Sequence, residues 1–320
     1  MSRINILCST DDKYVPWCGI MLTSVLENNP NDIYSIFILT AGLNPDNQTS
    51  FDNLSKKYSV PIQIITVRDE LTKDFCVRKE EHYISVATWY RLLAANVLPD
   101  EIEKVLYLDC DIIVNGSLSP LWNKDLAGYA IAGVPDESSY QDELFERLGY
   151  PKSDCYLNAG VLLINLNYWR EHQVLQRCKD FLLNVGESLV FYDQDTLNKV
   201  LHRETLIIEA TYNFQNGYLL SWQIGCYDEG LRAQIRECYQ DPCIIHFSGR
   251  TKPWQKECYS PYISYFLYYL QQSLWCATPL TGGISFKERV RRLLHFIAEK
   301  FNLKQPLYWT SKQNNKRSVF

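Results

Sequence analysis

The sequence lacks the glycine-rich loops that bind phosphate in two large classes of nucleotide-binding enzyme. Its 14 glycines form neither G-x-G-x-x-G nor G-x-x-x-x-G-K, which are the patterns of dinucleotide-dependent dehydrogenases and of P-loop NTPases. The segment where such a loop would stand, residues 9–14 after the first predicted strand, carries two acids instead. Both enzyme classes are therefore poor interpretations of this chain.

Long hydrophobic runs and paired cysteines are also missing. No run approaches the ~18 apolar residues of a membrane span. The 11 cysteines are odd in number and scattered without a C-x-x-C pair, which argues against a disulfide framework and a structural zinc site. Residues 1–13 predict a buried strand and its loop rather than a signal peptide. We expect free thiols and a cytoplasmic protein.

Charge is divided unevenly along the chain. The net charge is −5, yet nine Lys and Arg against two Glu give residues 284–320 a net charge of +7, leaving −12 for residues 1–283. Gly282 and Gly283 mark a hinge between the two parts. We expect a folded domain at 1–283 and a basic tail at 284–320.

The tail predicts a basic amphipathic helix. Ser285 and Glu288 match a capping box. The apolar residues that share one helical face are Phe286, Val290, Leu293, Leu294, Ile297 and Phe301. Such a helix either docks on an anionic membrane surface or packs on the domain with its charged face in water. The charge contrast favours the membrane surface.

Strands and helices alternate in the first part of the chain. Residues 4–8, 33–40 and 60–67 predict strands, and residues 18–26 and 46–58 predict helices. This alternation is typical of a parallel sheet with helices on both faces, where ligands bind beyond the carboxyl ends of the strands. Further strands are expected at 104–108, 129–134, 160–165, 206–209 and 243–247, and further helices at 85–96, 171–185, 193–201 and 260–276.

Two acids follow one of these predicted strands. Asp109 and Asp111 stand directly after residues 104–108, and such a pair can hold one divalent ion together with the oxygens of a diphosphate. The spacing alone is weak, because Asp193 and Asp195 repeat it. The alternative is a turn with a solvated acid pair.

A histidine stands near the end of another predicted strand. An imidazole at His246 can ligate Mn²⁺ beside two carboxylates, and Lys252 can neutralise phosphate charge. The alternative is a core histidine with satisfied hydrogen bonds.

Residues 9–14 can bind a base and a ribose, although Asp12 as a helix N-cap explains that loop equally well.

Six segments of the chain occur together in one known family. They are STDDKY (9–14), ISVATWYRL (84–92), KVLYLDCDIIVNGSLSPLW (104–122), YLNAGVLLINLNYWR (156–170), YDQDTLN (192–198) and IIHFSGRTKPW (244–254). In this order and spacing the sequence resembles the retaining glycosyltransferases of family 8, and among them the bacterial lipopolysaccharide galactosyl- and glucosyltransferases. The resemblance covers residues 4–260.

The resemblance implies a Rossmann-like GT-A fold, with a mostly parallel mixed central sheet, that binds a UDP-sugar with Mn²⁺ or Mg²⁺. It assigns the metal to Asp109, Asp111 and His246. Around the uridine of the donor it assigns Ser9, Thr10, Asp11 and Tyr14, and at the diphosphate it assigns Gly249 and Lys252. Around the donor sugar it assigns Arg91, Asp136, Asn158, Asp193 and Gln194, and it adds Cys110 to the donor site. Asp193 and Gln194 are the expected catalytic residues.

The expected reaction moves galactose or glucose from UDP to a saccharide or glycolipid acceptor, such as lipopolysaccharide or another cell-surface glycan. Gln194 stands where a nucleophile is sought, and because an amide is a poor nucleophile we favour front-face attack over a covalent intermediate. Residues 212–218 are a candidate acceptor wall. The rival interpretations are a nucleotidyltransferase and an inactive nucleotide-sugar-binding protein, and no nucleic-acid partner is expected.

Overall fold

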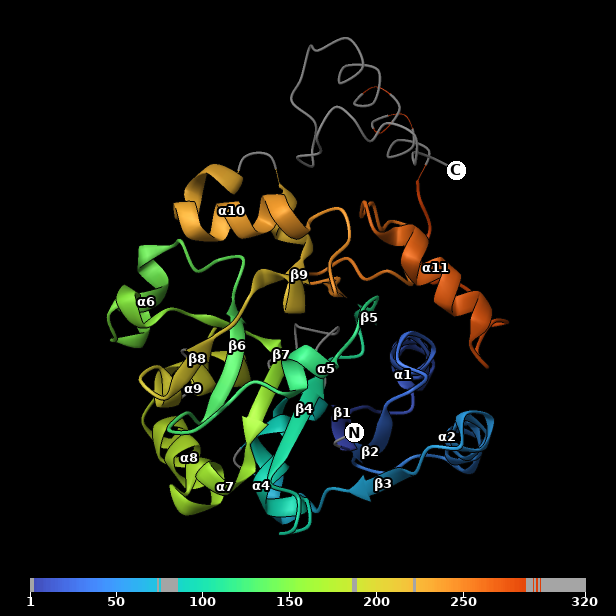
Figure 1. Ribbon diagram of the computed structural model, residues 1–320, viewed down its shortest axis with the longest axis horizontal. Coiled ribbons are helices and arrows are strands. Elements are labelled where there is room, and N and C mark those ends of the chain that lie inside the picture. Colours follow the sequence, from blue (N-terminus) through green and yellow to red (C-terminus); the bar gives the residue numbers. More distant parts are fainter. Residues whose placement is uncertain are drawn as a thin grey trace.

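The computed structural model describes residues 3–73, 75, 86–185, 189–220, 223–285, 290, 292 and 294. Within them, a seven-stranded sheet has the order β3-β2-β1-β4-β7-β6-β8 (Figure 1). β7 is antiparallel to β4 and β6, and the other paired neighbours are parallel. The strands are β1 (Arg3–Ser9), β2 (Ile33–Thr40), β3 (Ile62–Thr66), β4 (Lys104–Leu108), β6 (Ile131–Pro135), β7 (Leu157–Asn165) and β8 (Thr205–Ile207). The mixed, mostly parallel sheet is confirmed.

A second sheet of three short strands was only partly expected. It contains β5 (Ile112–Val114), β10 (Ile244–His246) and β9 (Phe214–Gln215) in that order. β10 pairs antiparallel with β5, which sets His246 opposite Ile112. The backbone N–H of Phe247 donates to the carbonyl of Asp111 at 2.9 Å. This register brings two segments far apart in sequence to one place.

The main sheet is covered on both faces because its strands are apolar on both faces. Along β4, Leu106 belongs to one hydrophobic core, whereas Tyr107 belongs to the other. The first core takes in α1 (Val15–Asn28), α2 (Pro45–Tyr58), α5 (Ser119–Trp122), α10 (Glu229–Cys238) and α11 (Ile263–Gln272). The second takes in the 3-10 helix η1 (Val86–Leu93), α4 (Ala94–Val97), α7 (Leu166–Glu171), α8 (Val174–Val185) and α9 (Tyr192–Leu201). The result is a three-layer α/β/α arrangement.

Shorter elements fill the connections. They are α3 (Asp69–Thr72), α6 (Asp142–Leu148), η2 (Lys152–Asp154), η4 (Ala210–Asn213), η5 (Asn216–Leu219) and η6 (Ile224–Cys226). Local capping explains several boundaries. The Asn44 side chain accepts from the N–H of Asn47 at the start of α2, and Asp228 does the same for Leu231 at the start of α10.

The predicted helices differ from the structure in two informative places. Residues 86–93 form a 3-10 helix rather than an α-helix, which puts side chains three apart on one line. The helix predicted at 171–185 begins at Val174, since Gln173 has a left-handed φ of 49°. Neither α6, α10 nor β5 was expected.

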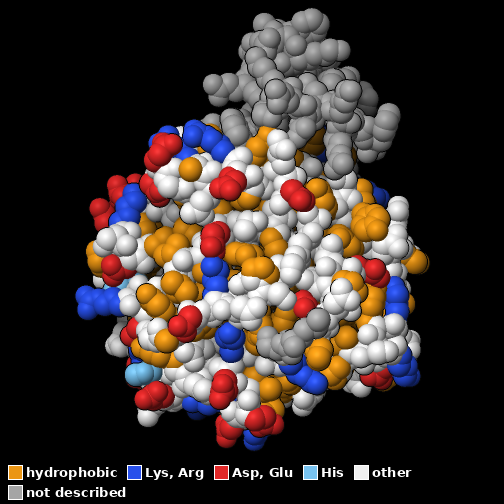
Figure 2. Space-filling view, in the orientation of Figure 1, with side chains coloured by type: hydrophobic (Ala, Val, Ile, Leu, Met, Phe, Trp, Pro, Cys, Tyr) orange, Lys and Arg blue, Asp and Glu red, His pale blue; other side chains and the backbone are white. Residues whose placement is uncertain are grey.

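The tail helix lies mostly outside the described residues, although Val290, Arg292 and Leu294 are helical. The division at residue 283 therefore stays a prediction. None of the helices in the described ranges has the length and apolarity that a membrane span requires. On the face of the body in Figure 2, acidic and basic side chains are interspersed, so its negative charge is not gathered in one patch there.

Candidate active site

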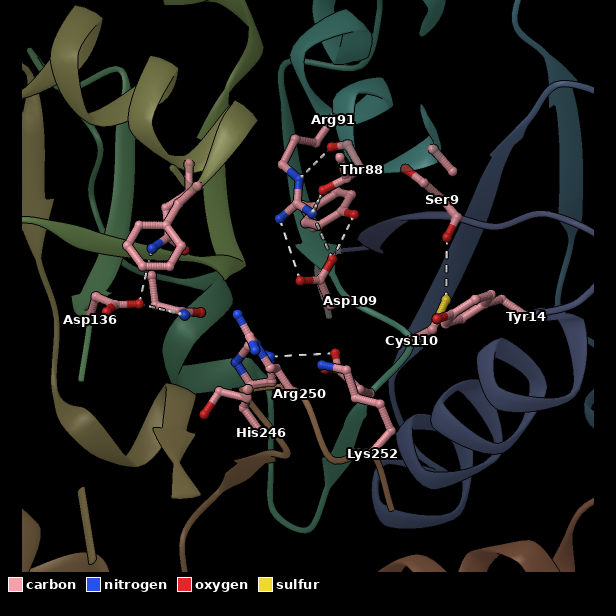
Figure 3. Close-up of a pocket in the computed structure, with 18 of the residues that line it drawn as sticks. Ser9, Tyr14, Thr88, Arg91, Asp109, Cys110, Asp136, His246, Arg250 and Lys252 are labelled. Atoms are coloured by element: carbon pink, nitrogen blue, oxygen red, sulfur yellow. Dashed lines mark hydrogen bonds and ion pairs between the residues drawn. The ribbon is translucent and has the colours of Figure 1, made fainter. Parts of the chain in front are cut away.

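A cavity of about 430 Å³ lies beyond the carboxyl ends of β1 and β4 (Figure 3). It adjoins a smaller cavity of about 160 Å³. The predicted site residues that line the larger cavity are Ser9, Thr10, Asp11, Tyr14, Arg91, Asp109, Cys110, Asp111, Asp136, Asn158, Gln194, His246, Gly249 and Lys252. Asp193 lines the smaller cavity, which also touches Arg91, Asp109 and Gln194. The structure therefore brings all of these residues to one region, while their roles stay predictions.

Two carboxylates and an imidazole converge on one side of the cavity. Asp109, Asp111 and His246 each offer a ligand atom, and these atoms lie within 4.8 Å of one another. The Nε2 atom of His246 is 3.4 Å from Oδ1 of Asp111. Gly160 on β7 permits this approach, because a Cβ there would lie 2.3 Å from Cε1 of His246 and 3.0 Å from Oδ2 of Asp109. A bulkier residue would fill the space that the two ligands share.

A lysine supplies positive charge at this cluster. The Nζ atom of Lys252 is 2.5 Å from Oδ2 of Asp111. Burial favours a higher pKa for Asp111, but the neighbouring ammonium group of Lys252 holds that pKa well below the usual range. Asp111 is thus an anion that already attracts a cation. Two carboxylates and one imidazole nitrogen are a donor set suited to Mn²⁺, and less well to Mg²⁺.

Arg91 joins the cluster to the smaller cavity. Its Nη2 lies 2.9 Å from Oδ1 of Asp109, and its Nε lies 2.9 Å from Oδ2 of Asp193. The guanidinium is 4.4 Å from the ring centroid of Tyr107, whose hydroxyl donates to Asp109 at 2.8 Å. The 3-10 geometry of η1 places Thr88 on the same side, where its carbonyl accepts from Arg91 Nε at 3.0 Å. One buried cation therefore compensates two carboxylates.

Asp193 keeps a free hydrogen-bonding position. Burial raises its pKa to about 6, against the opposing effects of Arg91 and of the Thr88 hydroxyl, which donates at 2.8 Å. The N–H at Arg91 Nε points to the Thr88 carbonyl, so Oδ2 of Asp193 accepts no hydrogen bond from any described residue. This buried carboxylate oxygen can therefore accept a hydrogen bond from a ligand hydroxyl.

The opposite wall is built from a carboxylate and neutral amides. Oδ2 of Asp136 accepts from Nδ2 of Asn158 at 2.9 Å and from Nε2 of Gln194 at 3.0 Å. The oxygen of Gln194 accepts from the backbone N–H of Ala159 at 2.9 Å. Both ends of the Gln194 amide are consequently fixed.

The loop after β1 closes on itself through Asp11. Oδ1 of Asp11 accepts from the backbone N–H groups of Lys13 and Tyr14 at 3.0 and 3.1 Å. Asp12, the alternative N-cap for the first helix, instead accepts from the backbone N–H of Asn44. The Tyr14 ring contacts Trp254 edge-on at 5.6 Å, and burial raises its pKa to about 12.

Several cavity residues had not been predicted. Glu137 and Arg250 line it, and Arg250 is labelled in Figure 3. Val190 and Phe191 are 43% and 44% exposed at its mouth. The signal for Arg250 was its position two residues before Lys252, whereas the two apolar residues carry no pattern of their own. Residues 212–218, the expected acceptor wall, do not appear among the described cavity residues.

This fold and this site are those of a sugar-transferring enzyme. The family model described as "Glycosyl transferase family 8" matches residues 5–258, and the chain belongs to that family. It is therefore a glycosyltransferase. The ten cysteines that the structure describes are free thiols.

Similar proteins cover nearly the whole length of the chain. General stress protein A of Bacillus subtilis is 28% identical over 85% of this chain and 94% of its own length. Lipopolysaccharide 1,3-galactosyltransferase of Salmonella typhimurium is 26% identical over 93% of this chain and 87% of its own. The crystal structure of the galactosyltransferase LgtC with donor and acceptor sugar analogs superposes with a TM-score of 0.77, at 24% identity, over 90% of this chain and all of that one. The last comparison establishes the fold.

Proposed function

We propose that this enzyme transfers galactose or glucose from UDP to a saccharide or glycolipid acceptor, such as lipopolysaccharide or another cell-surface glycan. The observation that carries the proposal is the convergence of two carboxylates, an imidazole and a lysine beyond β4. The names of relatives that act on lipopolysaccharide support the hexose and the acceptor class.

Asp109, Asp111 and His246 would hold the divalent ion, Mn²⁺ or Mg²⁺. When bound, that ion supplies Lewis-acid stabilisation of the negative charge on departing UDP. Lys252 adds a second positive charge once its Nζ exchanges Asp111 for a phosphate oxygen. Arg91 keeps Asp109 oriented throughout, because its guanidinium is tied to Asp193 as well. Gly249 and the loop of Ser9, Thr10, Asp11 and Tyr14 complete the site for UDP, with Cys110 between the two acids.

The sugar lies between the two walls in this proposal. Asp193 and Asp136 accept hydrogen bonds from its hydroxyls, and Asn158 orients Asp136. Gln194 positions the reacting carbon without attacking it, since its amide is fixed at both ends. Attack then comes from the face that UDP leaves, and the departing phosphate takes the acceptor's proton. Trapping a glycosyl adduct on Asp193 by mass spectrometry would exclude this course.

The acceptor is proposed to enter past Phe191. An aromatic ring that is half exposed at a polar cavity mouth can stack on the C–H face of a sugar. Val190 beside it widens the apolar rim. The acceptor hydroxyl would then reach the donor from the open side of the cavity.

The tail, residues 284–320, is proposed to hold the catalytic domain, residues 1–283, at the inner face of the cytoplasmic membrane. Val290 and Leu294 belong to the predicted apolar face, and they are 37% and 61% exposed. These two side chains are not buried against the body, which supports the membrane alternative, although the Arg292 side chain between them donates to the backbone carbonyl of Glu257 at 2.6 Å. The full chain should co-sediment with vesicles containing anionic lipid and not with neutral ones, whereas the Val290→Ser, Leu294→Ser double variant should bind less. Equal binding of both proteins would remove the membrane role.

Release of UDP from a panel of nucleotide-sugars tests the proposed function directly. UDP-galactose or UDP-glucose with Mn²⁺ should give acceptor-dependent release. A nucleotidyltransferase would instead be stabilised against heat by ATP or CTP with Mg²⁺ and not by UDP with Mn²⁺. An inactive binding protein would bind UDP but would release no UDP from any nucleotide-sugar of the panel.

A further inference from the structure

Asn213 is a buried residue that touches the proposed metal ligand from behind. Its side chain has no exposed surface, and its Oδ1 lies 2.9 Å from Nδ1 of His246. It stands at the end of η4, immediately before β9, the strand that pairs with β10 and so with His246. Asn213 does not line the cavity, so contact with a ligand does not explain why an asparagine stands at this position.

The chemistry of its neighbours fixes which way each amide faces. A carboxylate such as that of Asp136 has no N–H or O–H and can only accept hydrogen bonds, and its Oδ2 accepts from Gln194 as well as from Asn158. Asn158 must therefore present its NH₂ group to Asp136 and its oxygen to the other side. The backbone N–H of Gly160 can only donate, and it points to that oxygen at 3.0 Å. Two independent anchors thus give Asn158 the same orientation.

The orientation of the Asn158 amide determines that of the Asn213 amide, and through it which nitrogen of His246 carries the proton. Since the Asn158 oxygen accepts, the group of Asn213 that faces it at 2.9 Å must be the NH₂ group. Asn213 then presents its oxygen to His246, and an oxygen requires a proton on Nδ1. A neutral imidazole with its proton on Nδ1 has its lone pair on Nε2, the atom that faces Asp111.

We propose that Asn213 is a positioning residue that sets the tautomer and ring orientation of His246, so that Nε2 is available to the divalent ion. The proposal rests on the proposed function for the identity of that ion. A hydrogen bond from the second ring nitrogen commonly orients a metal-bound histidine. Here the acceptor is an amide whose own orientation is set by Asp136, a residue on the sugar side of the cavity.

The tautomer of His246 can be measured on the full chain without metal. Nitrogen-detected NMR of the ¹⁵N-histidine-labelled protein, with His246 assigned by comparison with His246→Gln, should show a protonated Nδ1 and an unprotonated Nε2. In Asn213→Leu the proton should no longer be confined to Nδ1. A proton on Nε2 in the unmodified protein overturns the proposal, whether or not any variant folds and whether or not the enzyme transfers hexose.

Metal binding gives the second readout. Titration of Mn²⁺ in the presence of UDP should show affinity about 10–100-fold weaker in Asn213→Leu, with UDP affinity in the absence of metal unchanged. Asn216→Leu is the matched control, because Asn216 is also buried but its oxygen accepts from Ser260. Asn213→Asp keeps an acceptor for Nδ1 and should retain more Mn²⁺ affinity than Asn213→Leu. Equal Mn²⁺ affinity of Asn213→Leu and the unmodified protein contradicts the positioning role.

Discussion

The two walls of the cavity are built on different principles. One wall uses formal charges in pairs, with Arg91 between Asp109 and Asp193 and with Lys252 on Asp111. The other wall uses one carboxylate, Asp136, which accepts hydrogen bonds from the neutral amides of Asn158 and Gln194 and so orients them. Charge pairs attract at a distance and can exchange partners when a charged ligand arrives, whereas amide hydrogen bonds depend on direction. The charged wall is accordingly suited to a diphosphate and a metal ion, and the amide wall to hydroxyl groups.

Removing the cation of the charged wall should have the largest effect on stability. Arg91→Met leaves Asp109 and Asp193 without compensation in a site where the Arg91 side chain is only 5% exposed. The free energy of unfolding should fall by about 3–5 kcal/mol at pH 8. The loss should be smaller at pH 5, because protonated Asp193 needs no partner. Urea unfolding at both pH values measures this, and a loss that is equal at the two would mean that the carboxylates are not the cause.

Removing a metal ligand should have the largest effect on activity. Asp111→Asn should lower kcat/KM for the donor by more than about 100-fold, which exceeds the usual effect of residues behind the ligands. The protein should still unfold cooperatively on heating. Asp52→Asn, an exposed acid on α2, is the control and should keep full activity. An Asp111→Asn enzyme that retains activity would show that the pair is only a turn.

Removing the aromatic ring beside the loop of residues 9–14 should weaken nucleotide binding alone. Tyr14→Ala should cost about 1–3 kcal/mol of UDP affinity if the ring stacks on uracil. Tyr14→Phe keeps the ring and should bind UDP nearly as well as the unmodified protein. Calorimetric titration with UDP compares the three proteins, and an unchanged Tyr14→Ala affinity would refute the stacking.

The pH dependence of kcat/KM should show the smallest of these effects, and it reports on a single residue. With a pKa of about 6 in the folded protein, Asp193 becomes an anion only above that pH, so kcat/KM should rise as pH increases through 6. The folded pKa lies above the ordinary value of roughly 3.9. This group therefore makes the protein less stable as pH rises from about 4 to 6.

Thr88→Val tests the assignment of that rise to Asp193. The Thr88 hydroxyl stabilises the anion and lowers the pKa of Asp193, so its loss should move the rise in kcat/KM to higher pH. Thr49→Val, at an exposed helical position, is the control. A rise that stays at the same pH in Thr88→Val would have to belong to another group.

The sequence predicted the sheet because its strands are apolar on both faces and its helices alternate with them. It also predicted the group of Asp109, Asp111 and His246. The two acids follow a buried strand, which Asp193 and Asp195 at the same spacing do not, and the resemblance assigned all three residues to one metal ion. Asp195 forms an ion pair with Arg147 at 2.7 Å and is not part of the group of Asp109, Asp111 and His246. Asn213 carries no motif, and its contact with His246 depends on the pairing of β9 with β10 across more than thirty residues. Such contacts arise from strand register, which no local pattern records.

The proposed function requires one divalent ion bound jointly by Asp109, Asp111 and His246. Titration of Mn²⁺ into the full chain with saturating UDP, followed by electron paramagnetic resonance of the free ion, measures this directly. We expect one bound ion for each chain, and we expect that binding to disappear in both Asp109→Asn and His246→Ala. Unchanged Mn²⁺ binding in these two variants, or full hexose transfer in the presence of EDTA, would contradict it.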